Sequence, residues 1–206
     1  MAFSGLKKLF GKKEQDSKYS LEDGLFVILY IKARLQPVHR GEMFEDPLDK
    51  ILREHLNGEV TGGGSYFKEN GEVEACDIEI YLKRESLNSF IEFIKRIDFP
   101  HGSHLQIDNE IIPIGSLDGM AIYLNGTDLP NEVYKQNDIN DVYNELEKLL
   151  EGCGEIYSYR EAEETALYIY GKDFEEMLDR IKGFLRTSPL CEKCRVVKIA
   201  GVKKES

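Results

Sequence analysis

The order of apolar and turn segments repeats once along the chain, and this repeat limits the fold more than any other feature. The first copy opens with an Asp-Gly pair at 23–24 and an apolar run over 25–31. The second opens with an Asp-Gly pair at 118–119 and an apolar run over 120–124. Each run has the length and composition of a β-strand. Two copies of one pattern predict two structural units that are built alike.

A helix is expected after the opening strand of each copy. In the first copy, Asp46 is a good N-cap and Pro47 suits the first helical position, so we predict a helix that starts there and ends at 57–58. In the second copy, apolar residues recur at helical spacing over 142–150, and Gly152 marks the end.

A hairpin, a second helix and a short closing strand complete each copy. The Asn-Gly pair at 70–71 predicts the first hairpin turn, and the charged stretch 160–164 predicts the second. Helical spacing of apolar residues predicts the second helices over 87–94 and 174–181.

The complete order is βαββαβ, twice, which predicts an α+β fold of two tandem repeats with antiparallel sheets. This order resembles the ferredoxin-like split βαβ fold over residues 24–200. The resemblance implies no activity, because this fold hosts many unrelated functions. We expect residues 1–23 to form a basic arm and linker, 24–118 the first repeat and 119–206 the second.

The opening strand of the first copy is apolar on both of its faces. Phe26, Ile28 and Tyr30 are as apolar as the residues between them, and a strand buried on both faces has such a continuous run. The second cover is expected from the other half of the chain, from the segment 111–114, or from a second chain. This pattern indicates an interface.

Charge and cysteine content narrow the class of partner and the compartment. The formal net charge is −11, and both copies are acidic, with ten Lys and Arg against seventeen Asp and Glu in 24–118 and twelve against seventeen in 119–206. An acidic surface repels nucleic acid and attracts basic proteins. Four cysteines and the lack of a secretory leader predict a cytoplasmic protein.

The first thirteen residues are basic and amphipathic. Phe3, Leu6 and Phe10 would share one face of a short helix, which predicts at most weak contact of residues 1–13 with a membrane surface. The alternative is an unstructured arm.

Three consecutive glycines mark the one candidate small-ligand site. Gly62, Gly63 and Gly64 lie in a predicted strand or hairpin, where glycines indicate a bulge or the close approach of a ligand or another backbone. A phosphate-binding loop is not expected, because such a loop sits between a strand and a helix start.

Four tyrosines alternate along two predicted neighbouring strands of the second copy. Tyr157, Tyr159, Tyr168 and Tyr170 are expected on one aromatic face, which is a candidate partner-binding surface. Stacking on RNA bases is not expected without surrounding basic residues. Core or dimer packing is the alternative.

Matching loops of the two copies carry a HxxH and a CxxC. His101, His104, Cys191 and Cys194 form the right ligand set for tetrahedral zinc if the loops meet. The alternative is two unrelated surface loops. A redox role for the CxxC is not expected, because the order is helix, CxxC, strand, the reverse of a thioredoxin-like site.

No catalytic motif is found in the sequence, so an enzyme is not expected. We predict a protein-binding module, of the immunity or inhibitor type, that neutralises a basic protein partner or associates with itself. The alternative is a ligand-sensing regulatory protein with paired halves like ACT domains. No cofactor is expected apart from the hypothetical zinc.

Overall fold

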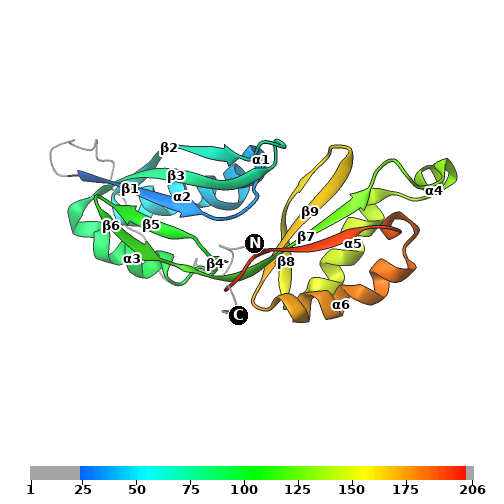
Figure 1. Ribbon diagram of the computed structural model, residues 1–206. Helices are drawn as coiled ribbons and strands as arrows, with labels where there is room; N and C mark the ends of the chain where they lie inside the picture. The colour runs from blue at the N-terminus through cyan, green and yellow to red at the C-terminus, as the bar shows by residue number, and fades with distance from the viewer. Residues whose placement is uncertain (1–23, 203–206) are drawn as a thin grey trace. The chain divides into compact units, whose positions relative to one another are not determined.

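The computed structural model describes residues 24–202, which form two compact α+β units that divide between Gly115 and Ser116 (Figure 1). Each unit has one antiparallel sheet and a small set of helices. The predicted arm over residues 1–23 lies outside the described residues. No helix within 24–202 has the length and apolar content needed to cross a membrane.

The first unit is built around a sheet with the strand order β2-β3-β1-β5-β6. Every neighbouring pair in it is antiparallel. The strands are β1 (Gly24–Ile31), β2 (Gly58–Phe67), β3 (Val73–Lys83), β5 (His104–Ile107) and β6 (Glu110–Pro113), with a two-residue β4 (Phe99–Pro100) before β5.

The central strand β1 buries one of its faces and leaves the other open. Leu25, Val27, Leu29 and Ile31 are all buried, whereas Phe26 between them is 59% exposed. Within a single chain this face is therefore open at Phe26, and its cover by a second chain stays a prediction. The segment 111–114 is not a cover either, because its residues up to 113 form β6, which pairs with β5 at the sheet edge.

The helical segment after β1 is longer than the sequence predicts. It begins at Pro37 and runs to Leu56 as α1 (Pro37–Arg40), a π-helical stretch (Gly41–Glu45), α2 (Asp46–Ile51) and a second π-helical stretch (Leu52–Leu56). Asp46 and Pro47 therefore lie inside it, and the predicted start and cap at Asp46 are wrong. The wider π turn ahead of Pro47 accommodates a residue that lacks an N–H and would crowd the preceding turn of an α-helix.

The predicted end of this segment and the first hairpin turn are confirmed. Asn57 adopts a left-handed conformation directly after the helical segment, as a C-terminal cap requires. Gly71, also at positive φ, donates its N–H to the carbonyl of Lys68 in the turn between β2 and β3. A second helix, α3 (Leu87–Ile94), buries Phe90, Phe93 and Ile94.

The second unit has the strand order β10-β7-β9-β8, again antiparallel throughout. Its strands are β7 (Gly115–Asn125), β8 (Gly154–Arg160), β9 (Glu164–Gly171) and β10 (Arg195–Ala200). Its helices are α4 (Asn131–Gln136), α5 (Ile139–Leu150) and α6 (Phe174–Thr187), followed by a short 3-10 turn (Pro189–Cys191).

One core cluster joins the helices of the second unit to one face of its sheet. Val142 and Leu146 of α5 and Met177 of α6 pack with Ile122 of β7 and Ile169 of β9. The predicted helical spacing over 142–150 is confirmed, because Val142, Leu146 and Leu150 are buried. Asp138 and Asp173 cap α5 and α6 by accepting backbone N–H groups.

Candidate functional site

The face of the first sheet that carries Phe26 is the candidate site, and we call it the open face. Alternate residues of a strand point to the same side, and directly opposed residues of an antiparallel pair share a face. By this rule and the observed register, the open face includes Phe26, Ile28, Tyr30, Tyr66, Asp77, Glu79, Tyr81, His104, Gln106 and Ile111.

Apolar side chains on the open face reach solvent on three different strands. Phe26 of β1 is 59% exposed, Tyr66 of β2 is 50% exposed and Ile111 of β6 is 60% exposed. Exposed apolar groups gathered on one face, as opposed to scattered singly, are typical of interaction surfaces.

Three rings form a line across the open face, and we call them the aromatic row. Tyr30 lies between His104 on β5 and Tyr66 on β2, with ring centroids 4.7 Å from His104 and 5.8 Å from Tyr66. Tyr66 is two strands away from Tyr30, and the intervening β3 residue opposite Tyr66 is Ala75. The small Ala75 side chain leaves room for the Tyr66 ring to lean across β3.

The Asp77 carboxylate lies beside the aromatic row and is oriented by two donors. The Gly64 N–H donates to Asp77 Oδ1 at 2.6 Å, and the Tyr66 hydroxyl donates to Asp77 Oδ2 at 2.6 Å. Within residues 24–202, neither Asp77 nor its neighbour Glu79 forms an ion pair with a Lys or Arg. The open face therefore presents two carboxylates that have no positive partner in this part of the chain.

The Asp77 carboxylate should control the ionisation of Tyr66. Its hydrogen bond, with desolvation and the charges of Asp77 and Glu79 adding to it, raises the pKa of Tyr66 from 10.0 to about 12. The folded state thus favours the neutral phenol. The stabilisation that follows is present below pH 10 and is lost as the pH rises through about 12. We expect Asp77→Asn to move the pKa of Tyr66 back towards 10, as measured by NMR of the Tyr66 ring. An unchanged pKa in the variant would mean that Asp77 does not hold the hydroxyl.

The far end of the open face is an apolar corner. The ring of Phe26 meets that of Tyr81 edge-on, with centroids 5.6 Å apart. Ile28, beside Phe26 on this face, is opposite Glu79 of β3 and Gln106 of β5. The apolar side chains of β1 therefore lie next to the acidic side chains of β3 on this face.

The three glycines of β2 make room for carboxylate side chains on both sides of the strand. A Cβ on Gly62 would meet Glu79 Oε2 at 3.1 Å, and one on Gly64 would meet Asp77 Oδ1 at 3.4 Å, both on the open face. A Cβ on Gly63 would meet Glu45 Oε1 at 3.1 Å on the helix side. The glycines lie against protein side chains on both faces, and their predicted role in binding a small ligand stays a prediction.

The helix side of Gly63 carries a mostly buried ion pair. Arg40 Nε lies 2.9 Å from Glu45 Oε1, and Arg40 Nη1 donates to the Ser65 hydroxyl at 3.1 Å. The bare strand at Gly63 lets this pair pack directly under β2. Two of the four acids between positions 42 and 49 form ion pairs within the unit, Glu45 with Arg40 and Asp49 with Arg53.

The four tyrosines of the second unit do not all share one face. Ser158 is opposite Tyr168 and Ile156 is opposite Ile169, so β8 holds one extra residue at Tyr157. This bulge moves Tyr159 to the position opposite Leu167, a core residue, because a shift of one residue reverses the side to which a strand residue points. The expectation of one four-tyrosine face is therefore wrong at Tyr159.

The other three tyrosines are buried, and two of them are in ring contact. Tyr157 and Tyr170 have ring centroids 4.8 Å apart, and Tyr157, Tyr168 and Tyr170 are buried, whereas Tyr159 is 43% exposed. Their role in partner binding stays a prediction.

The proposed zinc ligands belong to different units. His101 and His104 lie in the first unit, and Cys191 and Cys194 lie in the second. Across 24–202, no group of three or more His, Cys, Asp or Glu side chains is arranged to hold a metal ion. His104 stacks on Tyr30, a role in the aromatic row that its HxxH spacing did not suggest.

The cysteines of the CxxC resemble buried core residues more than redox thiols. Burial raises the pKa of both Cys191 and Cys194 above the usual value. A catalytic CxxC needs the opposite shift, because the thiolate is the reacting form. All four cysteines are free thiols.

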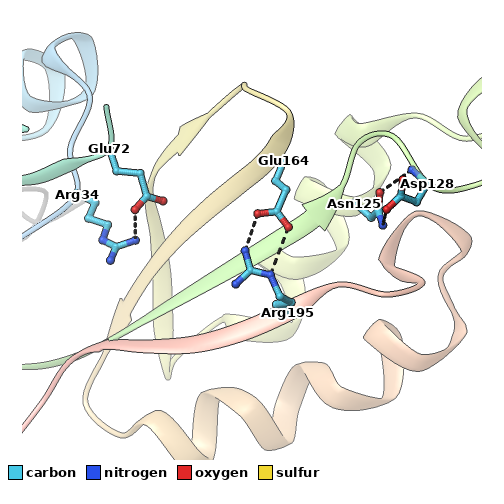
Figure 2. Close-up of polar contacts among 6 residues, drawn as sticks. All are labelled: Arg34, Glu72, Asn125, Asp128, Glu164 and Arg195. Carbon is cyan, nitrogen blue, oxygen red and sulfur yellow. Dashed lines mark hydrogen bonds and ion pairs between the residues drawn. The ribbon is translucent and has the colours of Figure 1, made fainter. Parts of the chain in front are cut away.

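The second unit has a broad depression of about 790 Å³ at the end of its sheet. It is lined by Asn125 and Tyr134, by Asp138 and Asp141 near the start of α5, and by Glu161 of the β8–β9 turn. Asn125 and Asp128 form a local turn at its edge, with the amide of Asn125 donating to Asp128 (Figure 2). The Asp138 carboxylate accepts the Asn140 N–H and so caps the start of α5.

Comparison with known proteins yields no family. No family model and no curated protein sequence matches the chain. Among solved structures, it is similar to a Fusobacterium nucleatum protein named "Putative monooxygenase", with 11% identity over 90% of this chain and 94% of that chain and a TM-score of 0.33. It is also similar to an unknown protein from Galdieria sulphuraria, with 12% identity over 87% and 99% of the two chains and a TM-score of 0.25. Both TM-scores are too low to support an argument about activity.

Proposed function

We propose that this protein is a non-enzymatic binding module whose open face takes a basic protein partner, in the manner of an immunity or inhibitor protein. The observation that carries the proposal is the combination on one face of exposed Phe26, Tyr66 and Ile111 with the carboxylates of Asp77 and Glu79, which pair with no Lys or Arg among residues 24–202.

The physical basis is complementarity to a cationic surface. Aromatic rings attract Lys and Arg through their faces, and unpaired carboxylates add charge attraction. The net charge of −11 would steer a basic partner towards the protein from a distance. Apolar anchors such as Phe26 would supply most of the binding free energy, as they do at other interfaces.

We also propose that each unit is a ferredoxin-like βαββαβ unit. The strand orders β2-β3-β1-β5 and β10-β7-β9-β8 support this, because both place the first and third strands of the unit in the middle. The hairpin strand β6 would then be an addition to the first unit, which extends the open face to Ile111.

The proposal predicts that Phe26→Ser lowers the amount of partner recovered at least about tenfold, an effect typical of losing an apolar anchor. The tagged full-length protein would be used to recover proteins from lysate of its own cells at moderate salt, with identification by mass spectrometry. We expect the wild type to recover one basic protein in near-equal amount, and Phe26→Ser to lose it.

The control is Val38→Ser on α1, which removes an apolar side chain of almost the same exposure, 58%. Equal recovery by both variants would place the contact elsewhere. Recovery of further copies of this chain alone would favour self-association over a basic partner.

A further inference from the structure

In the second unit, an arginine side chain lies on a tyrosine ring and pairs with a carboxylate. The first unit has part of the same arrangement. Arg195 of β10 places its guanidinium carbon 4.5 Å from the centroid of the Tyr123 ring. Its Nε and Nη2 also donate to the two oxygens of Glu164 at 3.3 and 2.5 Å (Figure 2). A guanidinium thus sits on a tyrosine face and binds a carboxylate bidentately, which matches its planar shape and fixed donors.

The first unit has the ring and the carboxylate but a different residue in place of the arginine. Arg195 pairs directly with Tyr123 across β10 and β7, and His104 pairs directly with Tyr30 across β5 and β1. In each unit the two strands are the closing strand and the central opening strand. At the position opposite the central tyrosine, the second unit therefore has the guanidinium of Arg195 and the first unit has the ring of His104.

The Asp77 carboxylate retains acceptor capacity for an incoming donor. A carboxylate has about four lone-pair sites on its two oxygens. The Gly64 N–H uses one on Oδ1 and the Tyr66 hydroxyl uses one on Oδ2. One site remains on each oxygen, which is the pattern that the two parallel N–H groups of a guanidinium require.

We propose that the aromatic row and Asp77 together form a receptor for one arginine side chain of the basic partner, an inference that rests on the proposed function and specifies how its partner is recognised. The guanidinium stacks on the ring of Tyr66, which is 50% exposed, and donates to Asp77, while Tyr30 supports that ring from its position between His104 and Tyr66. Glu79, two residues along β3, adds negative charge without direct contact.

Arginine is favoured over lysine because of shape. The row is a line of flat rings beside a carboxylate that is held in place by two donors. A planar guanidinium stacks on rings and pairs with both oxygens at once, whereas an ammonium group is a compact, strongly hydrated point charge.

The test uses defined peptides and the full-length protein, followed by NMR of its backbone amides at low salt. The probes are acetyl-Gly-Arg-Gly-amide, the same peptide with lysine, and the same peptide with citrulline, the neutral analogue of arginine. We expect the arginine peptide to shift the amides of Gly64, Tyr66 and Asp77 with a Kd of about 1–10 mM. The citrulline and lysine peptides should bind about tenfold more weakly.

Two variants test the receptor itself. Asp77→Asn removes the charge while keeping the shape, and Tyr66→Leu removes one ring while keeping the carboxylate. Each should weaken the arginine peptide about tenfold. The control is Glu92→Gln, which removes one exposed charge from α3 in the same unit and should leave the Kd unchanged.

Three results would overturn the inference. They are the absence of shifts at Gly64, Tyr66 and Asp77, equal binding of the lysine and arginine peptides, and an equal loss of binding in Glu92→Gln and Asp77→Asn. Any of these could occur while Phe26→Ser still loses its partner, in which case the proposed function stands without this receptor. Normal arginine binding with no partner recovered would count against the proposed function instead.

Discussion

Replacing Glu72 with leucine should lower the free energy of unfolding of the first unit by about 3–5 kcal/mol, because it removes one member of a mostly buried ion pair. Glu72 is 4% exposed, and its Oε2 accepts a hydrogen bond from Arg34 Nη1 at 3.2 Å (Figure 2). The Arg34 side chain is also mostly buried, at 11% exposure. Breaking a buried ion pair is among the few causes of a large single-residue effect.

A double variant that removes both members of the Arg34–Glu72 ion pair should be less destabilised than the single variant. Arg34→Met combined with Glu72→Leu should recover most of the loss, because replacing both members of a buried ion pair with apolar groups is often close to neutral. Urea unfolding followed by NMR signals of the first unit would measure it, with signals of the second unit as the internal reference. A double variant as unstable as Glu72→Leu alone would show that the two losses are independent and that the ion pair is not their cause.

Replacing Gly63 with alanine should lower the free energy of unfolding of the first unit by about 2–4 kcal/mol, because the added methyl group would clash with backbone atoms of the neighbouring strand. Its Cβ would lie 2.5 Å from the carbonyl oxygen of Asp77 and 3.3 Å from the Cα of Ile78. Both are backbone atoms of the neighbouring strand β3, so the strands themselves would have to separate. The change also crowds Glu45, the partner of Arg40.

The adjacent glycine provides the matched control. A Cβ on Gly62 would approach only the Glu79 carboxylate, at 3.1 Å, and that side chain can move away. Gly62→Ala should therefore change the free energy of unfolding by no more than about 0.5 kcal/mol, as for most surface substitutions. Comparable thermal stability of Gly63→Ala and the wild type would contradict the packing role assigned to Gly63.

The surroundings of these two glycines show why their role could not be predicted from the sequence. Consecutive glycines indicate that something approaches closely, and the sequence does not say what. In the fold, the neighbours are Glu79 and Asp77 of β3 and Glu45 of the helical segment, from positions 14 to 18 residues away along the chain. Only the pairing of β2 with β3 and with the helical segment brings them together.

The candidate site was likewise predictable from the sequence only in part. The apolar run of β1 indicated an interface, and that run does carry Phe26 and Tyr30 on the open face. No local pattern, however, links Tyr66, Asp77 and His104 to Tyr30, because each lies on a different strand. The four tyrosines of the second unit were the more obvious aromatic group, and a single extra residue in β8 separates Tyr159 from the rest.

Local chemistry by itself determined the α+β class, the positions of most strands and helices, and the turns at Asn57 and Gly71, because periodicity and backbone preferences act within a few residues. The sequence also determined the acidic charge on which the proposed partner class depends. Tertiary structure alone decided that the helical segment begins at Pro37, that β6 extends the sheet, and which residues meet on the open face. The physical reason is that strand register and sheet order bring together residues far apart in the chain, and a shift of one residue reverses the face that each side chain joins.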